Sequence, residues 1–549
     1  MNWILAIVSF LVLIILINNY YGKKRFKRLK AQLIQNWGKT KEKNYFNFYA
    51  IKQYFENNIH KNTGFHQISE RTAIDLDIDQ LFKFIDRTSS KIGQQYLYYK
   101  IRTIDTVEKL KKFDSLTKLF LNNDNLRLKN QLVLSKLNSH NSYDLEKLIN
   151  DKPIEKPNYL IYIYASPFIS ILLIILGFIN PIFFLFLLPV FFINTVFHYK
   201  NKENITYYLS GVNQLSKALK VGKELASNDE IKYHFTDLSF IKKVSIIQTK
   251  TEFIGFENHL ANEYALPLWL LIEIIKIQFM AEYIVFFSFV DSLTREKVSI
   301  DNLFQFIGEI DSAISVASLK SDDMEYCEPK FTMDKQIFTK NIVHPLIENC
   351  IPNDIHLNNK SLLLTGSNMS GKTTFIRTIA INSILAQTLN ICFAKEYSAP
   401  FMKVYSSIRI TDDLLEDTSY YLKEVLTIKE LIEASNDEKP CLFVLDEIFK
   451  GTNTIERVSG GKAILSFLNK GSHIVLVSTH DIELTELLEK ESYELHHFSE
   501  SIENNELYFD HKLKEGKLKT RNAIKILDLY KYPEEIIKDA RNTEKNNFG

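Results

Sequence analysis

Three long apolar runs decide which parts of the chain are suited to a membrane. The first, "NWILAIVSFLVLIILINN" at residues 2–19, has no charged residue and is long enough to cross a bilayer as a helix. Six of the next eight positions, 23–30, are Lys or Arg. Such a run can also contact nucleic acid or lipid headgroups, but beside a span it favours an anchor with a cytoplasmic C-terminal side. We therefore expect residues 1–22 to be a transmembrane anchor with the N-terminus outside the cytoplasm.

The second run extends from Asn158 to Phe197 without any Asp, Glu, Lys or Arg. "GFINP" at 177–181 lies in its middle, and Gly and Pro are typical of a tight turn. Charged segments flank the run at both ends. These features predict a hairpin of two transmembrane helices over 158–198, which returns the chain to the cytoplasm.

The third run, "ALPLWLLIEIIKIQFMAEYIVFFSFV" at 265–290, contains Glu273, Lys276 and Glu282. Each charge would cost roughly 2.5 to 3.5 kcal/mol at the centre of a bilayer. A further crossing would also place the C-terminal part of the chain outside the cytoplasm. This run therefore predicts a buried helix of a soluble region.

Shorter apolar runs further on are typical of buried strands, and the first ends in a glycine loop. "SLLLTGSNMSGKTTFIRTIAINSILAQ" reads as strand, loop and helix, and Gly366, Gly371, Lys372 and Thr373 match GxxxxGK[ST] in full. Glycines let the backbone N–H groups surround phosphates at a helix N-terminus. In such a loop the lysine reaches the β- and γ-phosphates and the threonine hydroxyl binds Mg²⁺.

Two later strand-like runs end in residues that complete this chemistry. "CLFVLDEIFKGTNT" places Asp446 at the magnesium and Glu447 where it can polarise the attacking water. "HIVLVSTHD" ends in Thr479 and His480, which are suited to sensing a γ-phosphate. Three strands in this order predict one ATP·Mg²⁺ site.

Composition and charge add mainly exclusions. The 549 residues are too many for one core, so at least two domains are expected. With 67 basic and 66 acidic residues, the net charge of +1 does not indicate a nucleic-acid partner. The four cysteines form no CxxC pair, which favours reduced core thiols over a disulfide framework or a zinc site.

The motifs resemble one family, the MutS mismatch-repair ATPases. "TGSNMSGKTTFIR" is similar to the family's P-loop, "LDEIFKGTNT" to its Walker B and D-loop, and "STHDIEL" to its histidine switch. "RITDDLLEDTSYYLKEV" resembles its signature helix, whose serine, here Ser419, completes the ATP site of the other subunit; Glu424 also matches. "VHPLI" at 343–347 and "IPNDI" at 351–355 resemble the approach to the nucleotide, and "LDIDQLFKFIDRTSSKIGQQYLYYKIRT" at 76–103 resembles the opening of the family's helical core.

The motifs and the resemblance together give a set of expected site residues. Those expected to hold ATP are Gly366, Ser367, Asn368, Met369, Ser370, Gly371, Lys372, Thr373, Thr374 and Ser419. Those expected at Mg²⁺ are Thr373 and Asp446, and those expected to act in hydrolysis are Lys372, Glu447 and His480.

The resemblance is dense from about 340 to 540, patchy from 70 to 110, and absent from both membrane regions. Mismatch-recognising members carry an N-terminal domain with a Phe-x-Glu wedge. Only about fifty residues separate the first span from the core-like segment here, and they contain no Phe-x-Glu. We therefore expect no domain that reads mispairs directly.

The expected fold is an α/β P-loop ATPase domain of the ABC type joined to an α-helical MutS-core-like domain, with three transmembrane helices. Its expected parts are an anchor (1–22), an N-terminal cytoplasmic helical region that includes the start of the core (23–157), a transmembrane hairpin (158–198), a helical lever region (199–330) and the ATPase domain (331–549).

The expected function is a multi-pass membrane ATPase, with its ATPase domain in the cytoplasm, that works as a homodimer with ATP and Mg²⁺ and couples hydrolysis to DNA binding. Two alternatives stay open. A transporter ATPase would carry a Ser-Gly-Gly signature before Walker B, whereas the only such triplet, Ser459-Gly460-Gly461, follows it. An ATP-switched membrane interaction module without DNA would differ from the expected function in lacking salt-dependent DNA affinity.

Overall fold

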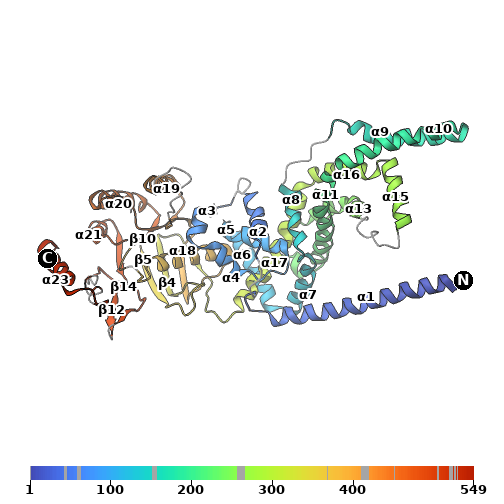
Figure 1. Ribbon diagram of the computed structural model, residues 1–549. Helices are drawn as coiled ribbons and strands as arrows, with labels where there is room; N and C mark the ends of the chain where they lie inside the picture. The colour runs from blue at the N-terminus through green and yellow to red at the C-terminus, as the bar shows by residue number, and fades with distance from the viewer. Residues whose placement is uncertain are drawn as a thin grey trace. The chain divides into compact units, whose positions relative to one another are not determined.

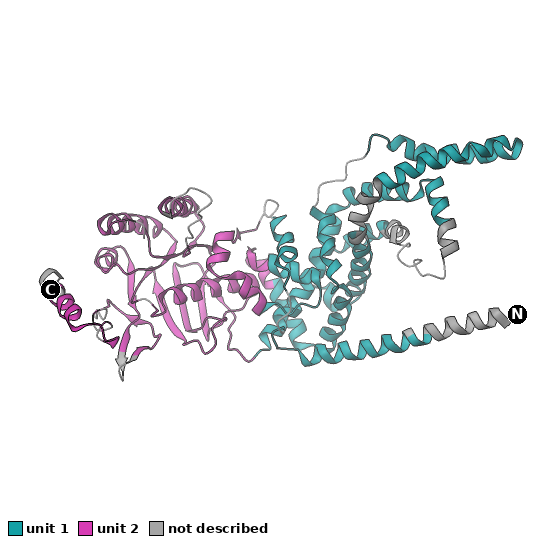
Figure 2. Cartoon of the chain, in the orientation of Figure 1, with its two compact units in different colours: residues 1–62, 85–99, 112–322 teal, residues 63–84, 100–111, 323–549 magenta. Residues whose placement is uncertain are grey.

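The protein divides into two compact units in a computed structural model (Figure 1, Figure 2). Unit 1 comprises residues 1–62, 85–99 and 112–322, and unit 2 comprises residues 63–84, 100–111 and 323–549. Two segments that the sequence places in the N-terminal region therefore belong to the same unit as the P-loop. The structure describes residues 2–41, 46–58, 64–150, 157–255, 266–367, 369–409, 420–449, 452–503, 506–518, 524, 527 and 529–548.

Unit 1 is helical. Its core forms where apolar stripes of several helices face each other; Phe304, Ile307 and Ile314 on α17, for example, are fully buried. Its principal helices are α1 (Asn2–Gln35), α2 (Phe48–Glu56), α7 (Asp124–Leu134), α8 (Leu145–Asn150), α9 (Leu160–Ile179), α10 (Ile182–Leu185), α11 (Leu187–Ala226), α13 (Ser239–Gly255), α15 (Leu266–Gln278), α16 (Ala281–Arg295) and α17 (Lys297–Lys320), and α5 (Lys91–Arg102) and α6 (Val107–Asn122) contribute residues to both units.

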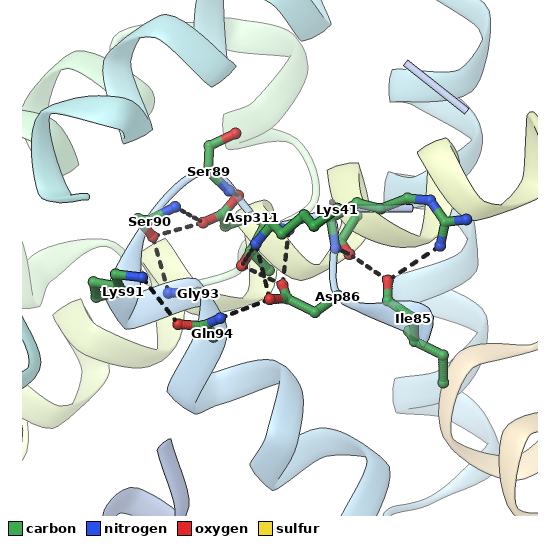
Figure 3. A network of polar contacts seen from close by, with 12 residues as sticks. Lys41, Ile85, Asp86, Ser89, Ser90, Lys91, Gly93, Gln94 and Asp311 are labelled. Carbon is green, nitrogen blue, oxygen red and sulfur yellow. Dashed lines mark hydrogen bonds and ion pairs between the residues drawn. The ribbon is translucent and has the colours of Figure 1, made fainter. Parts of the chain in front are cut away.

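A polar network crosses the middle of this helical core (Figure 3). Asp311 on α17 is fully buried, and its carboxylate accepts the backbone N–H groups of Ser89 and Ser90 at 2.8 Å and the Ser90 hydroxyl at 2.6 Å. Gly93 lies so close that a Cβ there would be 2.1 Å from Asp311 Oδ2. Beside it, buried Asp86 accepts hydrogen bonds from Lys41 Nζ at 2.8 Å and Gln94 Nε2 at 2.7 Å. Paired in this way, the two carboxylates hold the start of α5 against α17.

Two helices of unit 1 are long and apolar enough to cross a membrane: Leu160–Ile179 and Ile182–Lys200. Only 22% and 11% of their apolar windows are buried, so neither is a core helix. The second span consists of α10 and the first part of α11, and α11 then continues to Ala226, so that one helix joins the expected hairpin to the expected lever region. The side chains of residues 2–15 lie outside the described part, so the N-terminal span stays a prediction.

The single buried helix expected at 265–290 is wrong in detail, because the run forms two helices, α15 and α16. Met280 separates them in a left-handed conformation with φ of 48°. α16 is largely buried, but Ile274 and Ile275 on α15 are exposed. The charges that argue against a span are paired: Lys276 Nζ lies 3.5 Å from Glu273 and 3.9 Å from Glu282.

α15 packs on the α9–α11 hairpin through polar groups. Asn194 Nδ2 donates to the carbonyl of Gln278 at 2.8 Å, and Ser170 Oγ donates to the same carbonyl at 3.2 Å. His198 Nε2 lies 3.4 Å from Glu273 Oε1. The carbonyl end of α15, which has no helical partner of its own, is therefore satisfied by side chains of the hairpin.

Unit 2 is built on a six-stranded sheet in the order β14-β11-β6-β10-β9-β8, in which only β14 runs antiparallel. The central strands β6, β9 and β10 are mainly apolar and almost wholly buried because both faces are covered. Leu363, Phe443 and Val475 face α19, α20 and α21, which gather on one side (Figure 1). The strands are β6 (Ser361–Thr365), β8 (Lys403–Ser407), β9 (Cys441–Asp446), β10 (Ile474–Ser478), β11 (Tyr493–His497) and β14 (Lys514–Glu515), and the helices are α18 (Lys372–Leu389), α19 (Tyr420–Ala434), α20 (Thr454–Leu468), α21 (Glu483–Glu489) and α23 (Glu534–Phe548).

A second, four-stranded sheet has the order β3-β7-β4-β5. Next to it, an isolated bridge pairs Cys327 with Cys392, and both are free thiols. The sheet comprises β3 (Lys330–Thr332), β4 (Gln336–Ile342), β5 (Asn353–Asn358) and β7 (Glu396–Pro400); the unit is completed by β1 (His66–Gln67), β2 (Thr103–Ile104), α3 (Glu70–Asp75), α4 (Ile78–Ile85), β12 (Glu500–Glu503) and β13 (Glu506–Phe509). The parallel register of β6, β9 and β10 brings their carboxyl ends to one edge, where the predicted motifs lie.

Candidate functional site

The glycine loop connects β6 to α18 and adopts backbone angles that need its glycines. Gly366 has φ of 150° and Gly371 has φ of 110°, which side chains rarely tolerate. A Cβ at Gly366 would also lie 2.8 Å from the carbonyl oxygen of Phe498. Gly371 is the N-cap of α18, so the loop presents the positive end of that helix to its concave side.

Lys372 is buried beneath this loop. Its Nζ donates to the carbonyls of Gly366 and Ser367, both at 2.8 Å, and lies 3.3 Å from His480 Nε2. These weak carbonyl partners hold a full positive charge at the centre of the loop, where a phosphate would be a stronger partner. Met369 is 82% exposed beside it, and Asn368 lies outside the described residues.

The expected magnesium ligands meet between β6 and β9. Thr373 Oγ1 donates to Asp446 Oδ2 at 2.9 Å, and Ser478 on the adjacent strand β10 bonds the other carboxylate oxygen. A hydroxyl and one carboxylate are oxygen donors of the kind that Mg²⁺ takes alongside phosphates and water. No group of three or more His, Cys, Asp or Glu side chains that could hold a metal occurs in the searched, described residues.

Glu447 and His480 form the expected catalytic pair. His480 Nε2 lies 3.0 Å from Glu447 Oε1, and both side chains are partly exposed. Glu447 has φ of 53°, a left-handed conformation that is costly for a residue with a Cβ and is concentrated at functional sites. The strained turn after β9 aims the carboxylate at the cavity instead of into the sheet.

These side chains line one cavity of about 650 Å³, within the range of ligand sites. Sequence analysis did not single out three of its neighbours. Ser367 Oγ donates to Glu500 at 2.6 Å; His511 Nδ1 lies 3.1 Å from the carbonyl of Ser370; and Phe498 forms part of the wall. The residues that line the cavity are Ile342, Ile347, Glu348, Asn349, Cys350, Ile351, Asn353, Ser367, Met369, Gly371, Lys372, Thr373, Thr374, Phe375, Thr378, Asp446, Glu447, His480, Phe498 and His511.

Both segments expected at the approach to the nucleotide contribute to this wall, through Ile347, Ile351 and Asn353. The phosphate loop supplies polar groups to the cavity, and Ile347 and Ile351 of these segments add apolar side chains to its wall. A purine base has an apolar face and polar edges, so this division suits a nucleotide.

The predicted signature segment is only partly described. Ser419 lies outside the described residues, whereas α19 begins at Tyr420. Glu424 on α19 is buried and accepts the backbone N–H of Phe449, directly after Walker B. The Ser-Gly-Gly triplet lies inside α20 and not at a helix N-terminus, so it has no donors free for a phosphate.

A buried carboxylate from the N-terminal part of unit 2 fixes the end of β8. Asp75 is fully buried and accepts the Ser406 hydroxyl at 2.6 Å and the N–H groups of Ile408 and Arg409 at 3.0 and 2.8 Å. Asp77 then forms a bidentate pair with Arg409, at 2.8 and 2.7 Å. The motif-poor segment 63–84 thus orders the strand next to β9.

Two buried histidines of unit 2 are held neutral. Burial lowers the pKa of His66 to about 4, and its Nε2 lies 2.9 Å from the carbonyl of Val404 on β8. Burial and then the nearby Arg377 guanidinium lower the pKa of His344 to about 4. At neutral pH neither side chain brings a charge to the unit.

Comparison with known proteins relates most of unit 2 to the family that the motifs resemble. Residues 362–547 match the family MutS domain V. The DNA mismatch repair protein MutS of Listeria monocytogenes serotype 4a is 32% identical over 268 residues, which cover 46% of this chain and 31% of that protein. The proteins of the same name from Clostridium kluyveri and Staphylococcus epidermidis are 28% and 29% identical over 275 and 271 residues, each covering 47% of this chain and 31% of the relative. The chain therefore matches about a third of the length of these curated relatives.

Proposed function

We propose that the chain is a membrane-anchored ATPase of the MutS family that binds ATP with Mg²⁺, hydrolyses it as a homodimer and couples hydrolysis to DNA binding. One observation carries the proposal: Lys372, Thr373 and Asp446 meet at one edge of the sheet with the Glu447–His480 pair beside them. Proteins of this family are ATPases, and this chain retains each group that the reaction needs.

Each residue has a part that follows from its position. Lys372 exchanges its two carbonyl partners for phosphate oxygens when ATP enters the loop. Thr373 and Asp446 would hold Mg²⁺, which would neutralise phosphate charge. Glu447 takes a proton from the attacking water, and His480 keeps its carboxylate oriented across the 3.0 Å contact.

The dimer follows from the family's arrangement, in which the signature serine, here Ser419, completes the partner's site. Within one subunit, Glu424 connects the signature helix to the catalytic turn. It lies on α19 and accepts the backbone N–H of Phe449, two residues after Glu447. A movement of α19 on dimer formation would therefore reach the catalytic turn. Sedimentation of the protein with a non-hydrolysable ATP analogue tests this step.

Membrane anchoring is supported by the exposed apolar surface of the hairpin. Where the two helices enter the bilayer, Lys200 Nζ lies 5.3 Å from the centre of the Tyr159 ring, and Tyr199 is next to it, as in the aromatic and basic belts of membrane interfaces. With the anchor at 1–22 the spans number three, and the ATPase unit lies in the cytoplasm, where ATP is. The most exposed apolar side chains of the hairpin are Ile161, Phe168, Phe178, Ile179, Phe192 and Val196.

DNA is the proposed ligand of the helical region, and binding measurements test it. Detergent-purified protein is titrated with homoduplex, mismatched and branched DNA across a salt series, with and without ATP and beside Lys372→Ala. Affinity that falls with salt and responds to ATP in the unmodified protein alone supports DNA coupling. Hydrolysis without any DNA affinity would instead favour the ATP-switched interaction module, with a membrane protein as the partner.

A further inference from the structure

A second groove lies in unit 1, between α1, α7 and α11. It has a volume of about 420 Å³, and most of its lining is apolar. Phe26 and Leu29 from α1 face Leu132 and Val133 from α7. The complete lining is Gly22, Arg25, Phe26, Leu29, Lys129, Leu132, Val133, Ser135, Lys136 and Glu224.

The groove is fixed because α1 and α7 pack antiparallel. At the far end of the pair, the Arg127 guanidinium lies 3.7 Å from the centre of the Trp37 ring, a close cation–π contact. At the near end, Lys136 and Gly22 line the same groove. The N-terminal part of α1 therefore leaves the helical body at the groove.

Its position along α1 corresponds to the depth of lipid headgroups. Residues 2–19 span about 27 Å as a helix, close to the thickness of the hydrocarbon core. Tyr20 and Tyr21 follow, and Gly22 begins the groove. Within unit 1, the coloured part of α1 and the hairpin of α9, α10 and the start of α11 extend in the same direction (Figure 2), as two segments that enter one bilayer must.

The polar groups of the groove are mainly cationic. Lys136 is paired with Glu224 at 2.5 Å, which leaves Arg25 and Lys129 to face an incoming ligand. Neither has an acidic partner in the part of the chain that the structure describes. Phe26 keeps 54% of its surface exposed between them. An apolar floor with two cations at its rim fits a molecule that carries both a phosphate and a hydrocarbon chain.

We propose that this groove binds one anionic phospholipid, with the headgroup phosphate between Arg25 and Lys129 and an acyl chain that passes over Phe26 and Leu132 toward Gly22 and the bilayer. The lipid fixes the angle between the anchor and the helical body. The inference rests on the membrane anchoring in the proposed function, but not on ATP hydrolysis or DNA binding.

The test uses the full chain in nanodiscs that contain equal amounts of phosphatidylglycerol and phosphatidylcholine, released into native mass spectrometry to count retained lipids. Arg25→Gln/Lys129→Gln removes the two cations of the groove. Lys23→Gln/Lys27→Gln is the matched control, because it removes the same charge from the opposite face of α1. ATPase activity of both variants checks that the fold is retained.

We expect one retained phosphatidylglycerol per unmodified chain, about tenfold less in the groove variant, and no change in the control. Equal losses in both variants, or equal retention of phosphatidylcholine, would overturn the groove as a specific site. Displacement of the lipid by millimolar inorganic phosphate would show that the phosphate alone is recognised, against the proposal. A separate carbonate wash of membranes tests the anchor: extraction of the chain would contradict both the groove's depth and the anchoring, whatever the ATPase rate.

Discussion

The phosphate site of unit 2 and the polar network of unit 1 use similar contacts but differ in how the chain assembles them. In unit 2, each half of the site is a short motif at the end of a strand, and the register of β6, β9 and β10 brings the halves together. In unit 1, Asp311 binds Ser89 and Ser90 from more than 220 residues away (Figure 3). The candidate functional residues of unit 2 therefore lie in local motifs. The packing of unit 1 depends instead on contacts between residues far apart in the sequence, which no motif indicates.

The largest expected effect is on the chemistry of unit 2. Glu447→Gln removes the proton acceptor but keeps the shape of the side chain, so ATP hydrolysis should fall by about 10²- to 10⁴-fold while ATP binding persists. Single-turnover hydrolysis and a fluorescent-nucleotide titration separate the two quantities. Glu433→Gln, on the exposed face of α19, is the matched control. A hydrolysis rate within tenfold of that of the unmodified protein would show that Glu447 is not the proton acceptor.

The next largest effect is expected from a substitution that breaks the polar network of unit 1. Gly93→Ala places a Cβ 2.1 Å from Asp311 Oδ2 and 2.6 Å from Asp311 Cβ, so the whole side chain must move and release Ser89 and Ser90. The free energy of unfolding of unit 1 should fall by about 3 kcal/mol. Gly222→Ala is the control, because its Cβ meets only the flexible end of Leu303.

Hydrogen exchange followed by mass spectrometry reads the two glycine variants separately in each unit. Faster exchange confined to unit 1 in Gly93→Ala is the expected result. Equal effects of the two substitutions on exchange would mean that the contact with Asp311 contributes no more to the stability of unit 1 than the contact with Leu303.

The two units can also be compared by pH. His66 and His344 have a pKa of about 4 when folded and about 6.5 when unfolded, so the unfolded state binds protons first as the pH falls. Unit 2 should therefore lose about 2 kcal/mol of stability for each histidine between pH 7 and pH 5. His66→Gln should flatten this dependence in urea unfolding, whereas His356→Gln, at an exposed position on β5, should not.

The smallest effect concerns a long-range pairing of unit 2 that resembles the network of unit 1. Ser406→Ala removes one donor to Asp75 but leaves the N–H groups of Ile408 and Arg409, so stability should fall by about 1 kcal/mol. Ser407→Ala, which removes a neighbouring hydroxyl on the same strand, is the control. A loss of stability above about 3 kcal/mol would contradict this expectation. It would mean that the Ser406–Asp75 hydrogen bond contributes far more to the stability of this strand than one of three bonds to Asp75 should.

Local motifs made most of the candidate ATP site predictable. The loop around Lys372, the carboxylates Asp446 and Glu447, and His480 each follow a strand whose apolar run is plain in the sequence, and the structure brings them to one edge. The resemblance of residues 362–547 to the MutS family is confirmed by the match to domain V. Ser478, Glu500 and His511 were missed, because a single serine, glutamate or histidine carries no spacing signal.

Long-range packing made the rest unpredictable. The left-handed turn at Met280, which splits the third apolar run, has no glycine or proline to mark it. Segments 63–84 and 100–111 belong to unit 2, where Asp75 docks on β8, although residues 76–103, which overlap both segments, resemble the opening of a helical core. Such pairings depend on tertiary contacts, which neither periodicity nor composition encodes.

Magnesium-dependent ATP hydrolysis by the full chain, purified in detergent and measured beside Lys372→Ala, tests the central claim most directly. Lys372 is buried among loop carbonyls that a phosphate would replace, so the account predicts steady turnover that stops on chelation of Mg²⁺ and falls at least about 100-fold in the variant. Equal rates in the two proteins, or no hydrolysis by a folded chain that binds ATP, would contradict it.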